Sequence, residues 1–243
     1  FKDSRINIFE RSNYLFFQDI KKFKFYKEYK KLSVKKVNYE EKYIYFPLHY
    51  QPEATTVPYG NFYFDQINAL KILSNLSEKF NFKIFVKEHP DIFNISKTAW
   101  MAGTHSRSYI YYKNLSEIKN LKILDLKINS LDLIKNAHCV ATITGNSGVE
   151  TLFHNKFTII FGDAWYEKMS KGFKKYENFD DLEFFFANLE SSNHLENDEF
   201  SKFIEILKNE TVQLSKSGVY KEYLDEYKDL ANLFEKKIKH KIY

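Results

Sequence analysis

One stretch of the sequence places hydroxyl and glycine residues where a strand is expected to pass into a helix. It covers residues 142–150 (TITGNSGVE) and follows the apolar run 139–141 (CVA). The first N–H groups of a helix lack internal partners, and glycine lets a ligand approach the backbone closely. The stretch can therefore bind an anion, although it is neither G-x-G-x-x-G nor a P-loop. Its expected ligand-binding residues are Thr144, Gly145, Asn146, Ser147 and Gly148.

Three titratable residues nearby in the expected fold could do chemistry, and each has a plainer interpretation. His89 precedes Pro90 and can donate to a phosphate or leaving group, or else to a loop carbonyl. Glu53 lies in a proline-containing loop, where it can act as a general base or brace the loop. Glu150 can accept hydrogen bonds from ribose hydroxyls, or simply favour the dipole of its helix.

Other residues in the same loops are candidates for binding only. Arg107 is one of three arginines in a lysine-rich chain, so its use here is informative. It can bind an anion or form an ordinary salt bridge. We add Gln51, Lys87 and Pro90 as substrate- or nucleotide-binding residues. There is no C-x-x-C, H-E-x-x-H or D-x-D signature, and GNSGV is not a hydrolase elbow, so we expect neither metal nor cofactor.

The elements that must position these residues alternate between strands and helices. Apolar runs predict strands over residues 43–49, 82–86, 121–125, 138–142 and 157–162. Helical spacing predicts helices over residues 64–80, 109–115, 130–136, 178–189 and 197–240. This order predicts an α/β fold with a Rossmann-like, doubly wound parallel sheet. The candidate residues then follow strand ends at one edge of the sheet, where such folds bind ligands.

Charge is uneven along the 243 residues. The net charge is +5, and residues 1–42 hold 12 Lys+Arg against 6 Asp+Glu. We expect these residues to form a basic, aromatic-rich arm, followed by a nucleotide-sugar-binding domain over 43–190 and helices over 191–243. The arm can pack on the body as an amphipathic linker, the favoured interpretation, or contact anionic lipid. One cysteine and no apolar run of membrane-spanning length predict a cytoplasmic protein, and nothing besides the arm favours nucleic acid.

Several motifs together resemble the bacterial capsule polysaccharide biosynthesis family. They are residues 47–56 (PLHYQPEATT) with Asp65 and Gln66, residues 86–90 (VKEHP), 142–150, and 161–166 (FGDAWY), in the family's order. The resemblance covers residues 43–170. It implies glycosyltransferases of the GT-B type, with two Rossmann-like halves and a nucleotide-sugar donor, CMP-linked in some members that transfer Kdo.

By this resemblance, His89 contacts the nucleotide phosphate, Thr144 and Ser147 hold the donor, and Glu53 lies near the acceptor or the anomeric carbon. The chain is then the donor-binding part of such an enzyme, without metal, acting on a saccharide acceptor at the inner membrane face. The 42 residues before the predicted sheet are too few to supply the other GT-B half. Two alternatives stay open: a non-catalytic scaffold in capsule assembly, and a transferase that moves a phosphate-bearing group from a nucleotide.

Overall fold

The computed structural model describes residue 20 and residues 23–51, 53, 55–93, 106–191, 195 and 198–210. The chain divides into two compact units, residues 1–196 and 197–243. The first unit contains the sheet and the candidate residues. In the second unit, helix α7 (Glu199–Glu210) accounts for the start of the helix predicted over residues 197–240. The rest of that prediction, and most of the basic arm, lies outside the described residues.

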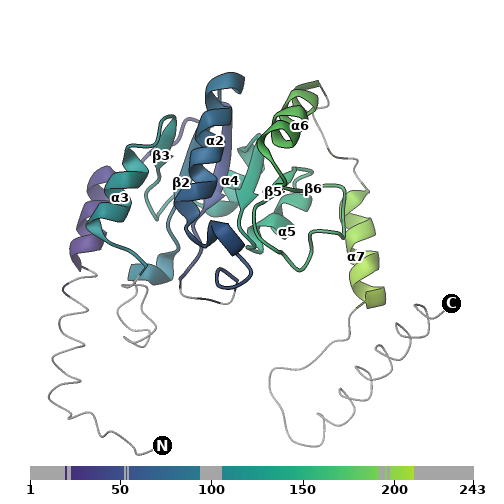
Figure 1. The fold of residues 1–243 in the computed structure, drawn as a ribbon, viewed down its shortest axis with the longest axis horizontal. Coiled ribbons are helices and arrows are strands. Elements are labelled where there is room, and N and C mark those ends of the chain that lie inside the picture. The colour runs from purple at the N-terminus through teal and green to yellow at the C-terminus, as the bar shows by residue number, and fades with distance from the viewer. Residues whose placement is uncertain are drawn as a thin grey trace, which may run out of the picture. The chain divides into compact units, whose positions relative to one another are not determined.

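The first unit is built on a six-stranded parallel sheet (Figure 1). Its strands are β1 (Tyr43–Pro47), β2 (Lys83–Lys87), β3 (Leu121–Ile123), β4 (Cys139–Thr142), β5 (Thr158–Ile160) and β6 (Phe173–Lys175). They lie in the order β3-β2-β1-β4-β5-β6, and every neighbouring pair is parallel. The predicted doubly wound α/β sheet is confirmed. Strand β6 was not predicted from the sequence.

Helices connect the strands and cover both faces of the sheet (Figure 1). They are η1 (Asn61–Phe64), α2 (Gln66–Phe80), η2 (Pro90–Phe93), α3 (Tyr109–Ser116), α4 (Ser130–Asn136), α5 (Ser147–Leu152) and α6 (Phe179–Ser191). One apolar core lies under α2, α3 and α6, and a second lies under α4. Asp65 caps the start of α2, where its side chain accepts from the N–H of Ile67, and Asn81 caps the end of the helix in the left-handed region.

Strand β1 shows how the sequence builds two cores. Its side chains alternate between faces, so Ile44 and Phe46 enter the core under α2 while Tyr43 and Tyr45 enter the core under α4. All four are buried. A strand covered on both faces must be apolar throughout, which explains why the run was recognisable from the sequence.

The strand order creates one crevice suited to a ligand. From β1 the chain moves outward through β2 and β3, then returns to the other side of β1 to form β4, β5 and β6. The direction in which successive strands are added therefore reverses between β1 and β4. The loops that follow the carboxyl ends of these two strands lead to opposite sides. Open α/β sheets bind ligands at this switch point.

The described part of the basic arm packs on the sheet domain. Residues 23–32 are helical, and Tyr29 from this helix is 1% exposed. Its ring lies 5.3 Å from that of Phe93 and 5.4 Å from that of Tyr112. Val34 pairs with Leu124, which adds a bridge beside β3.

No helix in the described part of the chain is long and apolar enough to cross a membrane.

Candidate functional site

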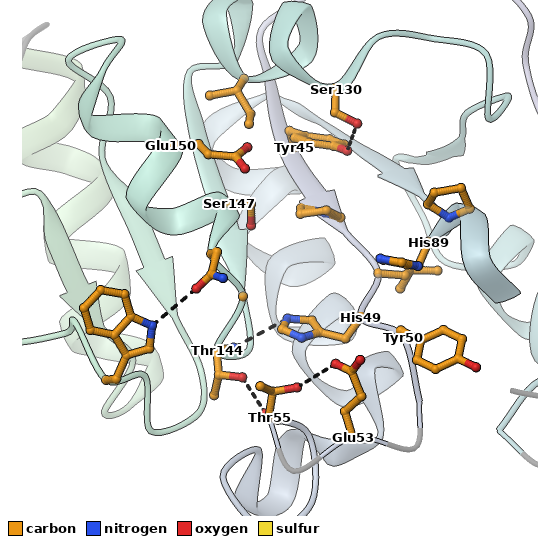
Figure 2. Close-up of a pocket in the computed structure, with 17 residues that line it drawn as sticks. Tyr45, His49, Tyr50, Glu53, Thr55, His89, Ser130, Thr144, Ser147 and Glu150 are labelled. Atoms are coloured by element: carbon orange, nitrogen blue, oxygen red, sulfur yellow. Dashed lines mark hydrogen bonds between the residues drawn. The ribbon is translucent and has the colours of Figure 1, made fainter. Parts of the chain in front are cut away.

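A cleft of about 580 Å³ opens at the switch point (Figure 2). Its walls come from the loops after β1, β2, β4 and β5 and from the start of α4. Eight of the predicted site residues line it: Glu53, His89, Pro90, Thr144, Gly145, Asn146, Ser147 and Glu150. The structure thus brings together residues from three separate predicted loops. The remaining four, Gln51, Lys87, Arg107 and Gly148, do not line the cleft.

The loop from β4 into α5 forms one wall of the cleft. The N–H of Gly145 donates to the Thr142 hydroxyl oxygen at 3.0 Å, which curls the loop back on the strand end. The Thr144 hydroxyl donates to the carbonyl of Thr55 and so ties this wall to the loop after β1. Ser147 begins α5, but that helix has only six residues, so its dipole gives less support to an anion than the sequence suggested.

His89 presents one ring nitrogen to the cleft. Its Nδ1 accepts a hydrogen bond from the N–H of Asp91 at 3.2 Å. A neutral imidazole that accepts at Nδ1 carries its proton on Nε2, so Nε2 is the available donor. The ring of Tyr50 lies 5.6 Å from that of His89 and limits its rotation. The side chain is thus oriented as a hydrogen-bond donor.

The two cleft carboxylates lie in different surroundings. Glu53 is exposed, and one of its carboxylate oxygens accepts from the Thr55 hydroxyl at 3.1 Å. Figure 2 shows its carboxylate beside His49. Glu150 lies near Tyr45 and Ser130 in the same view. Partial burial of its carboxyl group raises the pKa of Glu150, although the residue as a whole is exposed.

Arg107 stands behind the cleft and joins two of its loops. It is 2% exposed and forms a two-point ion pair with Glu88, with Nε–Oε2 and Nη2–Oε1 distances of 2.6 and 3.2 Å. The same guanidinium donates to the carbonyl of His49 at 2.9 Å and to Oε1 of Gln51 at 2.8 Å. Glu88 in turn accepts from the N–H of His89 at 2.8 Å. The pair therefore fixes the loops after β1 and β2 relative to each other.

Lys87 also supports the cleft from outside its lining. Its Nζ donates to the carbonyl of Ile128 at 2.6 Å and to the Ser130 hydroxyl at 2.8 Å. Burial lowers the pKa of Lys87, and Asp125 opposes this effect. These contacts hold the start of α4 against the end of β2. The Lys87 ammonium group is thus committed to the scaffold.

His49 lines the cleft but was not among the residues predicted from the sequence. Its Nε2 lies 2.9 Å from the Thr142 hydroxyl and accepts from the N–H of Ile143 at 3.2 Å. Burial, then the charges of Arg107 and His89, lower the pKa of His49 to about 4. His49 is the last residue of the strand predicted over residues 43–49, and His89 comes shortly after the one predicted over 82–86, so a position at a strand end was the available signal.

Gly148 is needed for the packing behind the loop. A Cβ atom at this position would lie 2.2 Å from the hydroxyl oxygen and 2.8 Å from Cζ of Tyr166. Tyr166 is buried, and its hydroxyl donates to the carbonyl of Gly145. The absence of a side chain at Gly148 therefore leaves room for the Tyr166 ring to pack against the cleft loop and to hydrogen-bond to it.

Replacing Gly148 with alanine is expected to lower the free energy of unfolding by about 2 kcal/mol, because the buried Tyr166 ring must move. Denaturant unfolding of the purified chain measures this change. The double variant Gly148→Ala/Tyr166→Leu is the control, since a smaller side chain at 166 gives the new methyl group room. If the double variant loses more unfolding free energy than the two single variants lose together, the explanation is wrong.

The described residues contain no group of three or more His, Cys, Asp or Glu side chains placed to hold a metal ion.

A comparison with solved structures finds similarity to two kinds of protein. The chain is 14% identical to UDP-GlcNAc 2-epimerase from Methanocaldococcus jannaschii, with a TM-score of 0.45 over 78% of this chain and 50% of that one. It is 17% identical to the beta Kdo 2,7 transferase of Thermosulfurimonas dismutans KpsC, with a TM-score of 0.41 over 76% and 52%. It is 15% identical to the beta Kdo 2,4 transferase of the same KpsC, with a TM-score of 0.42 over 78% of this chain and 54% of that one. The chain spans about half the length of these proteins.

No curated protein sequence matches the chain. A protein-family comparison does: the family described as capsule polysaccharide biosynthesis protein matches residues 4–175, more than half of the chain. The match includes the loops after β1, β2, β4 and β5 that form the cleft. The resemblance noted in the motifs is confirmed, and the chain belongs to the capsule polysaccharide biosynthesis protein family.

Proposed function

We propose that this chain is the donor-binding part of a capsule polysaccharide glycosyltransferase that uses a nucleotide-activated sugar, CMP-linked, and a saccharide acceptor. The observation that supports this most is the meeting of His89, Glu53 and the β4–α5 loop in one cleft at the switch point of a parallel sheet. Membership of the capsule family supplies the biological setting.

His89 has the geometry to stabilise a phosphate leaving group. Because Nδ1 is occupied by the N–H of Asp91, the Nε2–H group is the donor that a phosphate oxygen can accept from. As the glycosidic bond to the nucleotide breaks, negative charge grows on that oxygen. A donor already in place stabilises this charge without reorganisation.

Glu53 is the proposed general base toward the acceptor hydroxyl. Glu53 is exposed and lines the cleft, so that an incoming saccharide can reach its carboxylate. Removing the hydroxyl proton as the new bond forms is ordinary base catalysis by a carboxylate. Glu150, further along the same cleft, is proposed to accept hydrogen bonds from ribose hydroxyls.

The charge of the cleft supports a donor with one linking phosphate. The described residues that line it include two carboxylates, Glu53 and Glu150, and no lysine or arginine. A CMP-sugar brings one negative charge on its linking phosphate, whereas a UDP-sugar brings two. Each additional charge placed near carboxylates in a partly desolvated cleft costs binding energy. This favours a CMP-linked donor over a diphosphate-linked one.

Calorimetry of the full chain with CMP, CDP and UDP tests the proposal. We expect CMP to bind most tightly, because it carries the smallest phosphate charge. Tighter binding of UDP would overturn the preference for CMP. No heat of binding with any of the three at millimolar concentration would overturn the assignment of the cleft as a nucleotide site.

Replacing His89 with alanine is expected to weaken CMP binding about tenfold, the effect of losing one hydrogen bond to a charged oxygen. The same calorimetric titration measures it. His138→Ala is the matched control, since His138 precedes β4, at the opposite end of that strand from the cleft, and is not part of the cleft lining. Equal affinities of the His89→Ala variant and the wild type would remove His89 from the site.

A further inference from the structure

His49 is held in place by its backbone, and the hydrogen bonds of its ring to the described residues all involve one nitrogen, Nε2. Its backbone is held on both sides, because its N–H donates to Gln66 at 2.8 Å and its carbonyl accepts from Arg107 at 2.9 Å. His49 as a residue is 9% exposed, and its ring lies against Gly145, where an added Cβ would be only 3.0 Å from the Cε1 atom of the ring. The imidazole is therefore fixed at the cleft floor.

The hydrogen bonds of the ring determine where its proton is. A backbone N–H can only donate, and that of Ile143 points at Nε2 from 3.2 Å. Nε2 must therefore be the unprotonated nitrogen, and a neutral ring then carries its proton on Nδ1. The Thr142 hydroxyl accepts from Gly145, so its own proton is free to bond to Nε2 at 2.9 Å. Two donors thus hold the ring in one tautomer.

The Nδ1–H group has no hydrogen-bond partner among the described residues, although the ring lines the cleft. Figure 2 shows one ring nitrogen directed to the Thr144 side and the ring placed between that side and Glu53. We propose that His49 binds a phosphate oxygen of the nucleotide-sugar through Nδ1–H while its Nε2 holds the β4–α5 loop in place.

This proposal deepens the proposed function and rests on it. It gives the cleft two oriented imidazole donors, His49 and His89, in place of the cations that its described lining lacks. A neutral N–H donor can serve a phosphate without adding a buried charge. Because one ring serves both the loop and the ligand, the bound phosphate and the loop stabilise each other.

Two substitutions separate the roles of the two nitrogens. In His49→Gln the side-chain amide reaches about as far as Nε2, so it can still accept from Ile143 but provides no donor at the Nδ1 position. In His49→Asn the shorter amide lies near the Nδ1 position, so the loop contact is lost while a donor is kept. Calorimetry with CMP and with cytidine, which lacks the phosphate, is run on both variants and on the wild type.

We expect His49→Gln to weaken CMP binding about tenfold and to change cytidine binding by less than about twofold. His49→Asn should retain more CMP affinity than His49→Gln and have a lower melting temperature. If His49→Gln binds CMP as tightly as the wild type does, the ligand role is wrong and only the loop contact stands. If the wild type itself does not bind CMP, the proposed function fails first, and the inference fails with it.

Nitrogen-15 NMR of the histidine rings in the wild-type protein provides a readout that does not depend on a variant's folding. His49 should show a protonated Nδ1 and an unprotonated Nε2 in the free protein, and its Nδ1 signal should shift when CMP is added. A proton on Nε2, or an Nδ1 signal that does not move at saturating CMP, would overturn the proposal.

Discussion

Replacing Arg107 with methionine is expected to lower the free energy of unfolding by about 3–5 kcal/mol. The change leaves the Glu88 carboxylate, which is 1% exposed, without its counter-ion. It also leaves the carbonyl of His49 and Oε1 of Gln51 without the donors that Arg107 supplies. Chemical denaturation monitored by circular dichroism measures the loss.

A surface ion pair provides the control for this prediction. Lys122 and Glu41 are 2.7 Å apart, and their side chains are 39% and 31% exposed. Solvent screens this pair, so Lys122→Met should cost no more than about 1 kcal/mol. If both substitutions cost the same, burial would not explain the importance of Arg107.

The double variant Arg107→Met/Glu88→Gln sharpens the explanation. Removing both charges avoids leaving one of them alone in the interior, so the double variant should be more stable than Arg107→Met. The Glu88 position would still accept from the hydroxyl of Tyr112, which lies 2.9 Å from Oε2, through its amide oxygen. A double variant less stable than the single one would mean that the hydrogen bonds, and not the charge, carry the cost.

The central strands and most helices could be predicted because their burial leaves a clear pattern in the sequence. β1, β2, β4 and β5 are apolar runs covered on both faces. Strand β6 could not be predicted in the same way. It has three residues, two of them lysines, at the sheet edge, where its pairing with β5 depends on the rest of the sheet.

The site was predictable to the extent that it follows strand ends. Glu53, His89 and residues 144–147 come after three predicted strands, and a parallel sheet must bring such loops to one edge. The pairing of Glu88 with Arg107 could not be predicted, because the sequence between them has a mixed pattern that assigns neither a clear helix nor a clear strand. Nor does sequence spacing reveal that His49 contacts Thr142, 93 positions away.

His49 should also make stability depend on pH, because its surroundings oppose protonation. The pKa falls from 6.5 to about 4 in the folded chain, by burial first and then by the charges of Arg107 and His89. Between these values the unfolded chain binds a proton that the folded chain does not, so stability rises with pH. The contribution is complete above pH 6.5 and is lost as the pH falls toward 4, where the loss of stability reaches about 3 kcal/mol.

Comparison with His49→Gln isolates this effect from the other titrating groups. Glutamine does not titrate, while the remaining histidines and carboxylates are common to both proteins. Unfolding free energies measured from pH 7 to pH 4 should fall more steeply for the wild type, so the variant becomes the more stable protein as pH falls. Parallel curves would mean that the folded protein binds the proton at His49 as readily as the unfolded chain does. Burial and the charges of Arg107 and His89 would then not keep the ring neutral in the folded protein.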